Sequence, residues 1–558
     1  MAASPHVYDV IIVGSGVSGL SAAHYLMKAR PGLSYLVLEK GVGVGGTWLW
    51  NTYPGAACDV PSHWYSFSFA LNPGWTRRFS DAAEIRAYLE GVAAREGILP
   101  RVRFSATVER TVWEESLGGY ALTVRGGDGR VETLRARFVV AGCGALSTPS
   151  TPALPGAPSF RGATTHSGAW DPAVSLEGRR VGVIGTGCSA AQIVPAIAGT
   201  ARSVVVFQRS AHWLTPRMDH GYSPAVRWAF AWLPGVMWLY RVLLALLHDA
   251  RYFAFVRPAS DCLKRVATRL ANKHRARAVA DPELRAALTP NYPMGCKRVI
   301  VSDDFYPALC RPNVGLETRP IARLCAGGVV VGAAPGKRAL GGVAVVGAAG
   351  APPPGGAPGE AALHELDVVV YATGFDVVAS IDSLNVTGRG GVTMAAAFKG
   401  TGGPEAYLGV AAPHFPNMFF MMGPNTGLGH SSMITMIEAQ ARYAAEAIAG
   451  ALAEGARAVE VRADVCGAYN KALQGELAKN VWTSCHSWYN LQGVKNVVLW
   501  PFTTIRCTCA HPAAATRPPR HFSPPPTHTH ARACPARFPP TDHWETRHVD
   551  WAAYTVEK

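Results

Sequence analysis

Two stretches of the sequence have glycines at the spacing that binds the pyrophosphate of a dinucleotide. The first, Gly14-Ser15-Gly16-Val17-Ser18-Gly19, follows the apolar run 7–13 and precedes a segment of helical composition. Glycines let the backbone approach a pyrophosphate, and the free N–H groups of a helix N-terminus bind it. Glu39 ends the next apolar run, where a carboxylate can accept hydrogen bonds from ribose hydroxyls. This unit therefore predicts a site for an unphosphorylated ribose, as in FAD.

The second stretch is Gly185-Thr186-Gly187-Cys188-Ser189-Ala190, between apolar strands expected at 181–184 and 203–207. The second of these strands is followed by Gln208-Arg209 instead of an acid. An arginine here suits a 2′-phosphate that a carboxylate would repel, although it also suits an ordinary strand end at the surface. We therefore predict an NADPH site formed by this loop together with Arg209, Gln192 and Ser210.

A polar stretch from Phe160 to Asp171 lies between the two units. Its residues follow the spacing Phe-x-Gly-x-x-x-His-x-x-x-Trp-Asp. Neither its length nor its polarity suits a core helix or a buried strand. We expect an exposed functional loop that acts as the hinge between the two nucleotide sites.

The surrounding segments predict the elements that hold these units. Residues 103–112, 119–125 and 131–140 are typical of antiparallel strands on a small sheet, and 367–375 of a strand that returns to a dinucleotide sheet. The expected fold class is α/β, with two Rossmann-like dinucleotide-binding domains and a helical insertion. We place the FAD domain at 1–150 and 367–505, the NADP domain at 151–217 and 291–366, the helical insertion at 218–290 as a lid or substrate side, and a Pro/His-rich tail at 506–558.

Residues 228–247 of the insertion are almost wholly apolar, which raises the question of a membrane span. Pro234 and the central Arg241 favour a buried or an interfacial helix over a spanning one. Three interpretations of this segment stay open: it packs as core or lid, it contacts a membrane surface peripherally, or it spans the membrane.

Charge and cysteine content narrow the class of protein. The formal net charge is +15, and fourteen Lys and Arg against five Asp and Glu lie between Arg217 and Arg298. Such an excess indicates phosphate groups or a lipid surface as a partner, or a solvated basic face, and no nucleic acid is expected. The twelve cysteines are scattered, so we expect no disulfide scaffold. No signal segment precedes the strand that begins near Tyr8, which predicts a cytoplasmic protein, with membrane association as an open addition.

Two segments have compositions that do not build a core. Residues 326–359 are dominated by Ala, Gly, Val and Pro, which predicts a surface hairpin with a disordered expansion. From Cys507 onward, prolines, histidines and arginines alternate without apolar periodicity, which predicts a disordered tail. The histidines of this tail lack a defined ligand spacing, and no metal site is expected.

Two nucleotide loops with the 160–171 stretch between them resemble the class B flavoprotein monooxygenases, and more narrowly the type I Baeyer–Villiger monooxygenases, which depend on FAD and NADPH. The fingerprint of that family, Phe-x-Gly-x-x-x-His-x-x-x-Trp followed by Pro or Asp, is matched at Phe160, Gly162, His166, Trp170 and Asp171. The N- and S-oxygenating flavin monooxygenases usually have Phe or Tyr in place of the tryptophan. The resemblance covers roughly residues 7–505.

The resemblance implies a set of contacts on the flavin side. Gly46-Thr47-Trp48 is similar to the family's loop beside the isoalloxazine ring, and 53–59 to the segment whose aspartate, here Asp59, lies near the flavin. Residues 422–430 are similar to the flavin-side loop near the end of the FAD domain. The other cofactor contacts that we expect are Tyr65, Val108 and Met433.

The resemblance also implies the catalytic and NADP-side residues. Segment 293–298 is similar to the one that supplies the family's active-site arginine, here Arg298, and Lys297 would reach the NADP phosphate. Segment 487–489 is similar to a late segment that touches the nicotinamide nucleotide, here through Trp488. His166 and Trp170 would contact the cofactor from the linker, with His166 tying the interdomain loop down and not donating a proton.

The chemistry implied is the conversion of a ketone to an ester or lactone. Flavin reduced by NADPH would bind O2 as a C4a-peroxyflavin, which must stay deprotonated to attack the carbonyl. Arg298 would supply the necessary positive charge and stabilise the tetrahedral adduct, and Asp59 would hold Arg298 in place. The apolar insertion suggests a hydrophobic ketone.

Two other functions stay open. An N- or S-oxygenating flavin-containing monooxygenase would keep the peroxide protonated and act on a soft nucleophile. A flavoprotein without monooxygenase activity is the second alternative, because the family usually continues after Trp500-Pro501 with a glycine and an aromatic strand, whereas here residues 502–505 lead into the tail. We therefore expect the final strand or helix to be lost or replaced.

Overall fold

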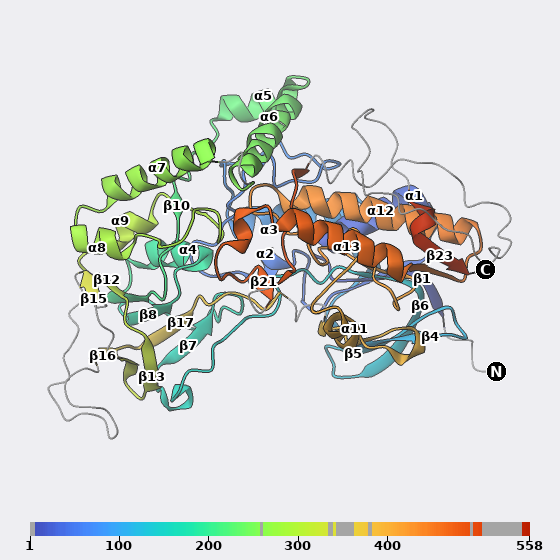
Figure 1. Ribbon diagram of the computed structural model, residues 1–558, viewed down its shortest axis with the longest axis horizontal. Helices are drawn as coiled ribbons and strands as arrows, with labels where there is room; N and C mark the ends of the chain where they lie inside the picture. Colours follow the sequence, from blue (N-terminus) through green and yellow to red (C-terminus); the bar gives the residue numbers. More distant parts are fainter. Residues whose placement is uncertain are drawn as a thin grey trace.

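The computed structural model describes residues 6–256, 261–332, 339–341, 362–377, 382–491, 495–504 and 549–557. Two large sheets, of eight and six strands, organise these residues. Figure 1 shows the sheet of the first glycine loop toward the end of the molecule where both termini lie, and the sheet of the second loop at the other end. The α/β class with two dinucleotide-binding domains is confirmed.

The first sheet has the strand order β18-β4-β5-β6-β1-β2-β3, and β19 also pairs with β6. β1 pairs in parallel with β2 and β6, so its buried apolar run lies inside the sheet. Helices α1 and α12 cover it and share one apolar core. The bounds are β1 Val7–Val13, α1 Val17–Ala29, β2 Tyr35–Leu38, α2 Thr47–Trp50, α3 Ala82–Arg95, β3 Val102–Arg103, β4 Ala106–Glu114, β5 Gly119–Gly126, β6 Val131–Ala141, β18 Val386–Thr387, α11 Met394–Gly400, β19 Met418–Phe420 and α12 Met433–Ala453.

The expected antiparallel strands are present as β4, β5 and β6. They do not form a separate small sheet, because β6 continues past β5 and runs parallel to β1. One long strand therefore joins the antiparallel ribbon to the parallel part of the first sheet.

The second sheet has the order β15-β12-β9-β8-β17-β7, and α4 and α9 pack together beside it. β12, β9, β8, β17 and β7 run parallel to one another, whereas the edge strand β15 pairs antiparallel with β12. The bounds are β7 Ala163–His166, β8 Arg180–Ile184, α4 Cys188–Ile197, β9 Ser203–Phe207, α9 Phe305–Leu309, β12 Val314–Glu317, β15 Ala339–Gly341 and β17 Val368–Tyr371.

Strand β17 corrects the domain boundary expected near residue 367. It lies between β8 and β7 in the second sheet, and not in the first. The chain returns to the first sheet only at β18, which pairs with β4. Apolar composition predicts a buried parallel strand but does not say which of two similar sheets it joins.

A three-stranded antiparallel sheet stands beside the second sheet. It consists of β13 Ile321–Cys325, β14 Gly328–Val331 and β16 Ala362–Glu365. The expected hairpin is therefore present where β13 turns into β14, and the proline-rich expansion at 351–356 lies outside the described residues.

The insertion is helical, as expected, and projects from one edge of the molecule (Figure 1). Of the described helices, none has by itself the length and apolar composition to cross a membrane. α5 together with Val236–Ala254 meets the criterion only as a pair bent by 104°. The helices of the insertion are α5 Pro224–Trp232, α6 Val236–Ala250, α7 Asp261–Ala278 and α8 Pro282–Ala287. They are flanked by the strands β10 Leu214–Thr215 and β11 Ile300–Val301.

The last described residues correct the expected disordered tail. Strand β23 Tyr554–Glu557 pairs antiparallel with β20 Ala458–Val461, and the buried Tyr554 hydroxyl accepts a hydrogen bond from Tyr443 at 2.9 Å. The described chain therefore ends in a strand, although this strand does not follow directly after Pro501. Residues 506–548 of the expected tail lie outside the described chain. The remaining elements are α13 Ala463–Leu477, β21 Asn490–Leu491 and β22 Lys495–Asn496.

Candidate active site

The first glycine loop is a cradle that side chains would fill. Gly14 has φ of +98°, and a Cβ atom there would lie 2.7 Å from the carbonyl oxygen of Gly142. A Cβ atom on Gly46 would lie 2.8 Å from the Cα of Gly16, so the loop before Thr47 packs directly on the first loop. Gly16 caps α1 without a side-chain hydrogen bond, which leaves the helix N-terminus suited to a phosphate.

Glu39 is buried immediately after β2 and fixes this loop. One carboxylate oxygen accepts hydrogen bonds from the backbone N–H and the hydroxyl of Ser15, at 2.8 and 2.9 Å. The other accepts from the Gly41 N–H at 2.7 Å. Two carboxylate oxygens have about four acceptor positions, so one stays open for a ribose hydroxyl.

The expected flavin-side residues lie in three places. Trp48 donates a hydrogen bond from Nε1 to the Tyr65 hydroxyl at 3.2 Å, so the structure brings these two together next to Thr47. Val108 is buried in β4 within the core behind the first sheet. Met433 begins α12 and packs against the apolar cluster that contains Leu428.

The second loop has the same backbone plan. Gly185 has φ of +115°, and a Cβ atom there would lie 2.5 Å from the Ala372 carbonyl oxygen. The Thr186 hydroxyl donates to the Ser210 carbonyl at 3.1 Å, and Gly187 caps α4, which begins with Cys188, Ser189 and Ala190, without a side-chain bond. The loop is therefore tied to the segment that follows β9.

Positive charge gathers beyond the end of β9. Arg209 is exposed, and Lys297 donates from Nζ to the Ser210 hydroxyl at 3.4 Å. Partial burial lowers the pKa of Lys297, and the Arg209 charge lowers it further. Two cations that repel each other around a hydroxyl fit an anion such as a ribose 2′-phosphate.

Gln192 has a contact that its place in the nucleotide loop does not predict. Its Oε1 accepts a hydrogen bond from the Tyr53 hydroxyl, and its Nε2 donates to the Ala57 carbonyl, both at 2.8 Å. Helix α4 is thereby fastened to the segment that leads to Asp59. Sequence reasoning missed this role because the partners are more than a hundred residues apart.

Asp59 and Arg298 meet beside this contact, although 239 residues separate them. Arg298 donates from Nη2 and Nε to Asp59 Oδ2, at 2.5 and 3.2 Å. Their side chains keep 36% and 25% of their surface exposed for Arg298 and Asp59, so the pair is open on one side. The Asp59 charge raises the pKa of Arg298. Burial alone would raise the pKa of Asp59, but Arg298 outweighs burial and holds that pKa below its usual value.

The positive charge of Arg298 affects the pKa of residues in both domains. It opposes the rise that burial causes in the pKa of Cys188, at the start of α4, and in the pKa of the buried Tyr489. Trp488, by contrast, is 51% exposed. The late segment therefore faces Arg298 through Tyr489, which the sequence did not single out as the contact.

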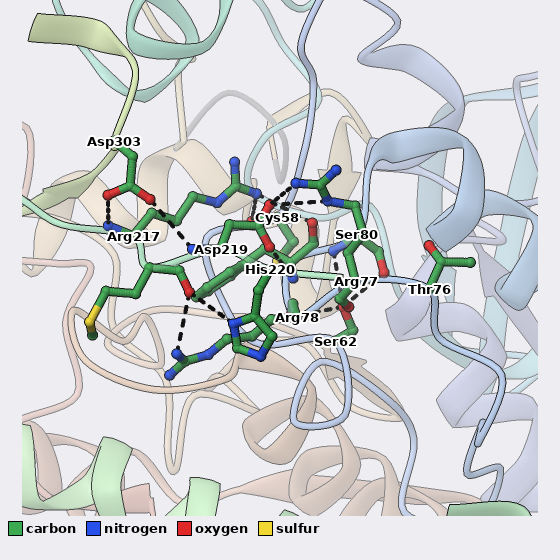
Figure 2. A network of polar contacts seen from close by, with 12 residues as sticks. Cys58, Ser62, Thr76, Arg77, Arg78, Ser80, Arg217, Asp219, His220 and Asp303 are labelled. Atoms are coloured by element: carbon green, nitrogen blue, oxygen red, sulfur yellow. Dashed lines mark hydrogen bonds and ion pairs between the residues drawn. The ribbon is translucent and has the colours of Figure 1, made fainter. Parts of the chain in front are cut away.

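A polar junction anchors the segment before Asp59 to the second domain (Figure 2). Arg217 donates from Nη2 to the Cys58 carbonyl at 2.9 Å, and its backbone N–H donates to Asp303 at 2.9 Å. Arg77 donates to one oxygen of Asp219 from Nη2 at 2.8 Å and from Nε at 3.2 Å. The junction thus holds the Asp59 side of the ion pair while the chain of Arg298 approaches from the other domain.

One disulfide, between Cys296 and Cys485, is present although no disulfide scaffold was expected. It joins the segment of Arg298 to the segment of Tyr489 across 189 residues. Scattered cysteines gave no pairing signal, because the two partners become neighbours only in the folded chain.

The linker differs from the exposed loop that was expected. Ala163–His166 is β7, the edge strand of the second sheet, and residues 165–168 are buried. His166 accepts a hydrogen bond at Nδ1 from the Gly168 N–H at 2.9 Å and lies 3.4 Å from the Thr373 hydroxyl through Nε2. Burial lowers the pKa of His166, so the ring is neutral near pH 7. An edge strand tolerates polar side chains, which is why the polarity of this stretch was misleading.

Trp170 and Asp171 close the linker. Trp170 is half-buried against the apolar core of the second domain. The Asp171 backbone N–H donates to the Thr165 hydroxyl at 3.1 Å, and its carboxylate accepts from the Ala173 N–H at 2.9 Å. Both residues therefore stabilise the turn that leaves β7.

The chain is similar to known proteins over most of its length. Residues 12–82 match the family of NAD(P)-binding Rossmann-like domains, and residues 74–220 match the L-lysine 6-monooxygenase/L-ornithine 5-monooxygenase family. A Baeyer–Villiger monooxygenase of Streptomyces coelicolor is 40% identical over 500 residues, which are 89% of this chain and 89% of the relative. The FAD-binding monooxygenase ktnD of Aspergillus niger is 34% identical and covers 89% of this chain and 79% of its own. The structure of cyclohexanone monooxygenase from Rhodococcus sp. Phi1, bound to NADP+, has a TM-score of 0.76 at 27% identity, with 91% of this chain and 97% of that chain covered.

Proposed function

Because the chain belongs to the Baeyer–Villiger monooxygenase family, we propose that it uses NADPH and O2 to convert a hydrophobic ketone to an ester or lactone through a flavin C4a-peroxide. Ketone, O2, NADPH and a proton give the ester, water and NADP+. The observation that carries this proposal is the partly open Arg298–Asp59 pair between the two nucleotide units.

The two units fit the two cofactors of such a reaction. FAD suits the first, where the glycine cradle and buried Glu39 lie next to Trp48 and Tyr65. NADPH suits the second, where Arg209, Lys297 and Ser210 gather. A relative named as FAD-binding and a solved relative with bound NADP+ support this assignment. When bound, the flavin accepts the hydride and activates O2.

Arg298 would then hold negative charge on the oxygen that attacks the ketone and on the resulting adduct. Its guanidinium is charged at every working pH, and Asp59 contacts it only at Nε and Nη2. The guanidinium has N–H groups that Asp59 does not use, and its side chain keeps 36% of its surface exposed, so it can bind an anion without a change in protonation. Asp59 fixes the guanidinium in place, so little reorganisation is needed when charge develops.

Replacing Arg298 with alanine tests this role. Flavin reduction by NADPH, followed anaerobically by loss of flavin absorbance, should stay within a fewfold of the parent rate, because hydride transfer does not use the cation. Ester formation should fall by about a hundredfold or more, since one or two charge-assisted hydrogen bonds contribute roughly 1.5–3 kcal/mol each. Arg202→Ala, an exposed arginine before β9, is the matched control. Ester formation at the parent rate in Arg298→Ala would refute the proposal.

Oxygenation of nitrogen or sulfur is the second candidate. The match of residues 74–220 to a lysine and ornithine monooxygenase family favours it. A panel of ketones, amines and thioethers separates the two functions. Products from amines or thioethers with no ester from any ketone would replace the first proposal with the second.

A further inference from the structure

Helix α6 of the insertion buries Arg241, His248 and Asp249 together with Leu244, and exposes its other leucines and Trp238. These five large apolar residues are each half-exposed or more. A helix on the surface of a globular protein normally shows the reverse arrangement. The exposed residues are Trp238 (62%), Leu239 (64%), Leu243 (50%), Leu246 (54%) and Leu247 (52%).

The buried polar face fixes the orientation of α6. Arg241 donates from Nη1 to the His63 carbonyl at 2.6 Å and from Nη2 to the Ser66 carbonyl at 2.8 Å. Its guanidinium also lies over the Trp64 ring, 5.1 Å from the ring centre. Rotating the helix to bury its leucines would break these bonds, so the apolar face is held outward.

The end of the same helix is anchored just as firmly. His248 donates from Nδ1 to the His430 carbonyl at 3.2 Å, and Asp249 accepts from the Thr504 backbone N–H at 3.0 Å. These partners belong to the loop before α12 and to the segment after Pro501. The outward face of α6 is therefore a rigid extension of the first domain.

Helices α5 and α7 of the insertion also expose apolar side chains. α5 exposes Trp228 (57%) and Trp232 (72%), and α7 exposes Leu263 (48%), Val266 (47%) and Leu270 (57%). The α7 residues recur at helical spacing and form one stripe. Figure 1 shows α5, α6 and α7 along the edge of the molecule that projects beyond both sheets. We call the exposed apolar residues of α5, α6 and α7 the insertion surface.

Basic residues accompany the stripe of α7. Lys264 lies beside Leu263, and Arg265, Arg269, Lys273 and Arg277 follow, whereas Asp261 is the only acid of the helix. Apolar side chains with tryptophan on one face and lysine and arginine along its border are the features of a helix that lies in a membrane interface. The positive charge is complementary to anionic headgroups.

A second copy of the chain fits this surface poorly. In a symmetric dimer the same patch lies on both sides of the interface, so the basic residues of α7 would be brought close to those of the second copy. Such like charges repel, and Lys is depleted from the core of protein interfaces. A lipid surface meets both the apolar and the basic part.

We propose that the insertion surface binds peripherally to a membrane that contains anionic lipids, with the tryptophans and leucines at the level of the headgroups. The helices lie on the membrane and do not cross it, in keeping with the 104° bend between α5 and the following helix. The binding does not depend on the proposed oxygenation, and either proposal can fail without the other.

Vesicle sedimentation of the full-length holoprotein tests the proposal. Phosphatidylcholine vesicles with and without phosphatidylglycerol are compared at low and at high salt. The protein should sediment with the anionic vesicles and lose affinity as salt is added, because the basic residues act through screened charge. Failure to sediment with either kind of vesicle would overturn the proposal.

Two pairs of variants locate the contact. Trp232→Ser with Leu239→Ser should lower the affinity about tenfold or more, because each large apolar side chain would lose its burial in the interface. Lys264→Glu with Arg269→Glu should lower it by a similar factor on anionic vesicles only. Val131→Ser and Arg130→Glu, on an exposed turn and strand of the first domain, are the controls and should bind like the parent. Retained flavin shows that each variant is folded.

Three results would contradict the assignment. Binding that none of the insertion variants weakens would place the contact elsewhere. A dimer in size-exclusion chromatography that the serine variants abolish, without vesicle binding, would make a second copy the occupant. Resistance of the bound protein to extraction at alkaline pH would indicate a membrane span instead of peripheral attachment.

Discussion

In the first nucleotide unit β2 is followed by Glu39, and in the second unit β9 is followed by Gln208. The carboxylate of Glu39 turns back to Ser15 and Gly41 and closes the glycine loop. The amide of Gln208 instead donates to the Ala287 carbonyl at 2.8 Å and leaves the loop to the exposed Arg209. The two units share the same strand, loop and helix arrangement, yet at the place where a ribose would lie the first has the negative Glu39 and the second the positive Arg209.

The backbone of the two loops is alike, and the difference between the units lies in the side chains that follow β2 and β9. In both loops the glycine position is enforced by a carbonyl oxygen, of Gly142 in the first and of Ala372 in the second. The pyrophosphate site thus depends on packing, whereas the choice between a free and a phosphorylated ribose depends on one or two charged residues. Mutations of these charged residues should therefore change the affinity of each unit for its nucleotide.

The largest effect is expected from giving the first unit the charge of the second. Glu39→Arg should lower the affinity for FAD about a thousandfold or more, because the loop loses three hydrogen bonds to a charged group, each contributing about 1.5–3 kcal/mol. The measurement is the amount of FAD per polypeptide after gel filtration, and titration of the apoprotein with FAD.

Glu39→Gln serves as the milder counterpart, since it keeps the shape and removes the charge. Its loss of affinity should be smaller than that of Glu39→Arg. Glu90→Arg, a change of the same type on the exposed part of α3, is the control for surface charge. Full FAD occupancy in Glu39→Arg would show that the carboxylate is not part of the site.

A smaller effect is expected in the second unit. Arg209→Ala should raise the KM for NADPH by about ten- to a hundredfold, because it removes a charge-assisted contact to the 2′-phosphate. The KM for NADH should stay nearly unchanged. Steady-state kinetics with both cofactors measure the ratio.

Lys297→Ala sharpens the same test. This variant should also raise the KM for NADPH, but by a smaller factor than Arg209→Ala, since Lys297 also donates to Ser210. Arg202→Ala, at the opposite end of β9, should leave both constants unchanged. Equal changes for NADPH and NADH in Arg209→Ala would contradict a role at the 2′-phosphate.

Features that depend on neighbouring residues could be predicted from the sequence. The strand, loop, helix and second strand of each unit follow one another in the chain, so Gly14 to Glu39 and Gly185 to Arg209 were recognisable from spacing alone. The helical nature of the insertion was predictable for the same reason. Polarity misled only at β7, where an edge position permits Thr165 and His166 in a strand.

Features that depend on distant residues could not be predicted from spacing. Asp59 and Arg298 became a candidate pair only through resemblance, and the contact of Gln192 with Tyr53 had no signal at all. The disulfide of Cys296 and the return of β23 to β20 share this limit. In each case the partners are joined by the fold, and composition reports only on what a segment can bury.

A last effect is expected from acid, and it concerns the stability of the fold instead of cofactor binding. The first domain buries His63, His248 and His430 where α6 packs on it, and burial lowers the pKa of each to about 4. In the unfolded chain these rings have their ordinary pKa near 6.5. Between pH 6.5 and pH 4 the unfolded state therefore binds protons that the folded state does not. Stability should be level above pH 6.5 and should fall as the pH drops toward 4, by on the order of 1 kcal/mol per pH unit for each histidine.

Denaturant unfolding at several pH values between neutral and acid measures this slope, and His248→Gln tests its origin. Glutamine can still donate to the His430 carbonyl but does not titrate, so the variant should lose its own share of the slope below pH 6.5 while its stability near neutral pH stays close to that of the parent. The rest of the slope comes from the other buried histidines, including His212 of the second domain, whose pKa burial also lowers to about 4. His6→Gln, an exposed histidine before β1, should keep the full slope. If His248→Gln also keeps it, the acid sensitivity does not arise where α6 meets the first domain but from other titrating groups.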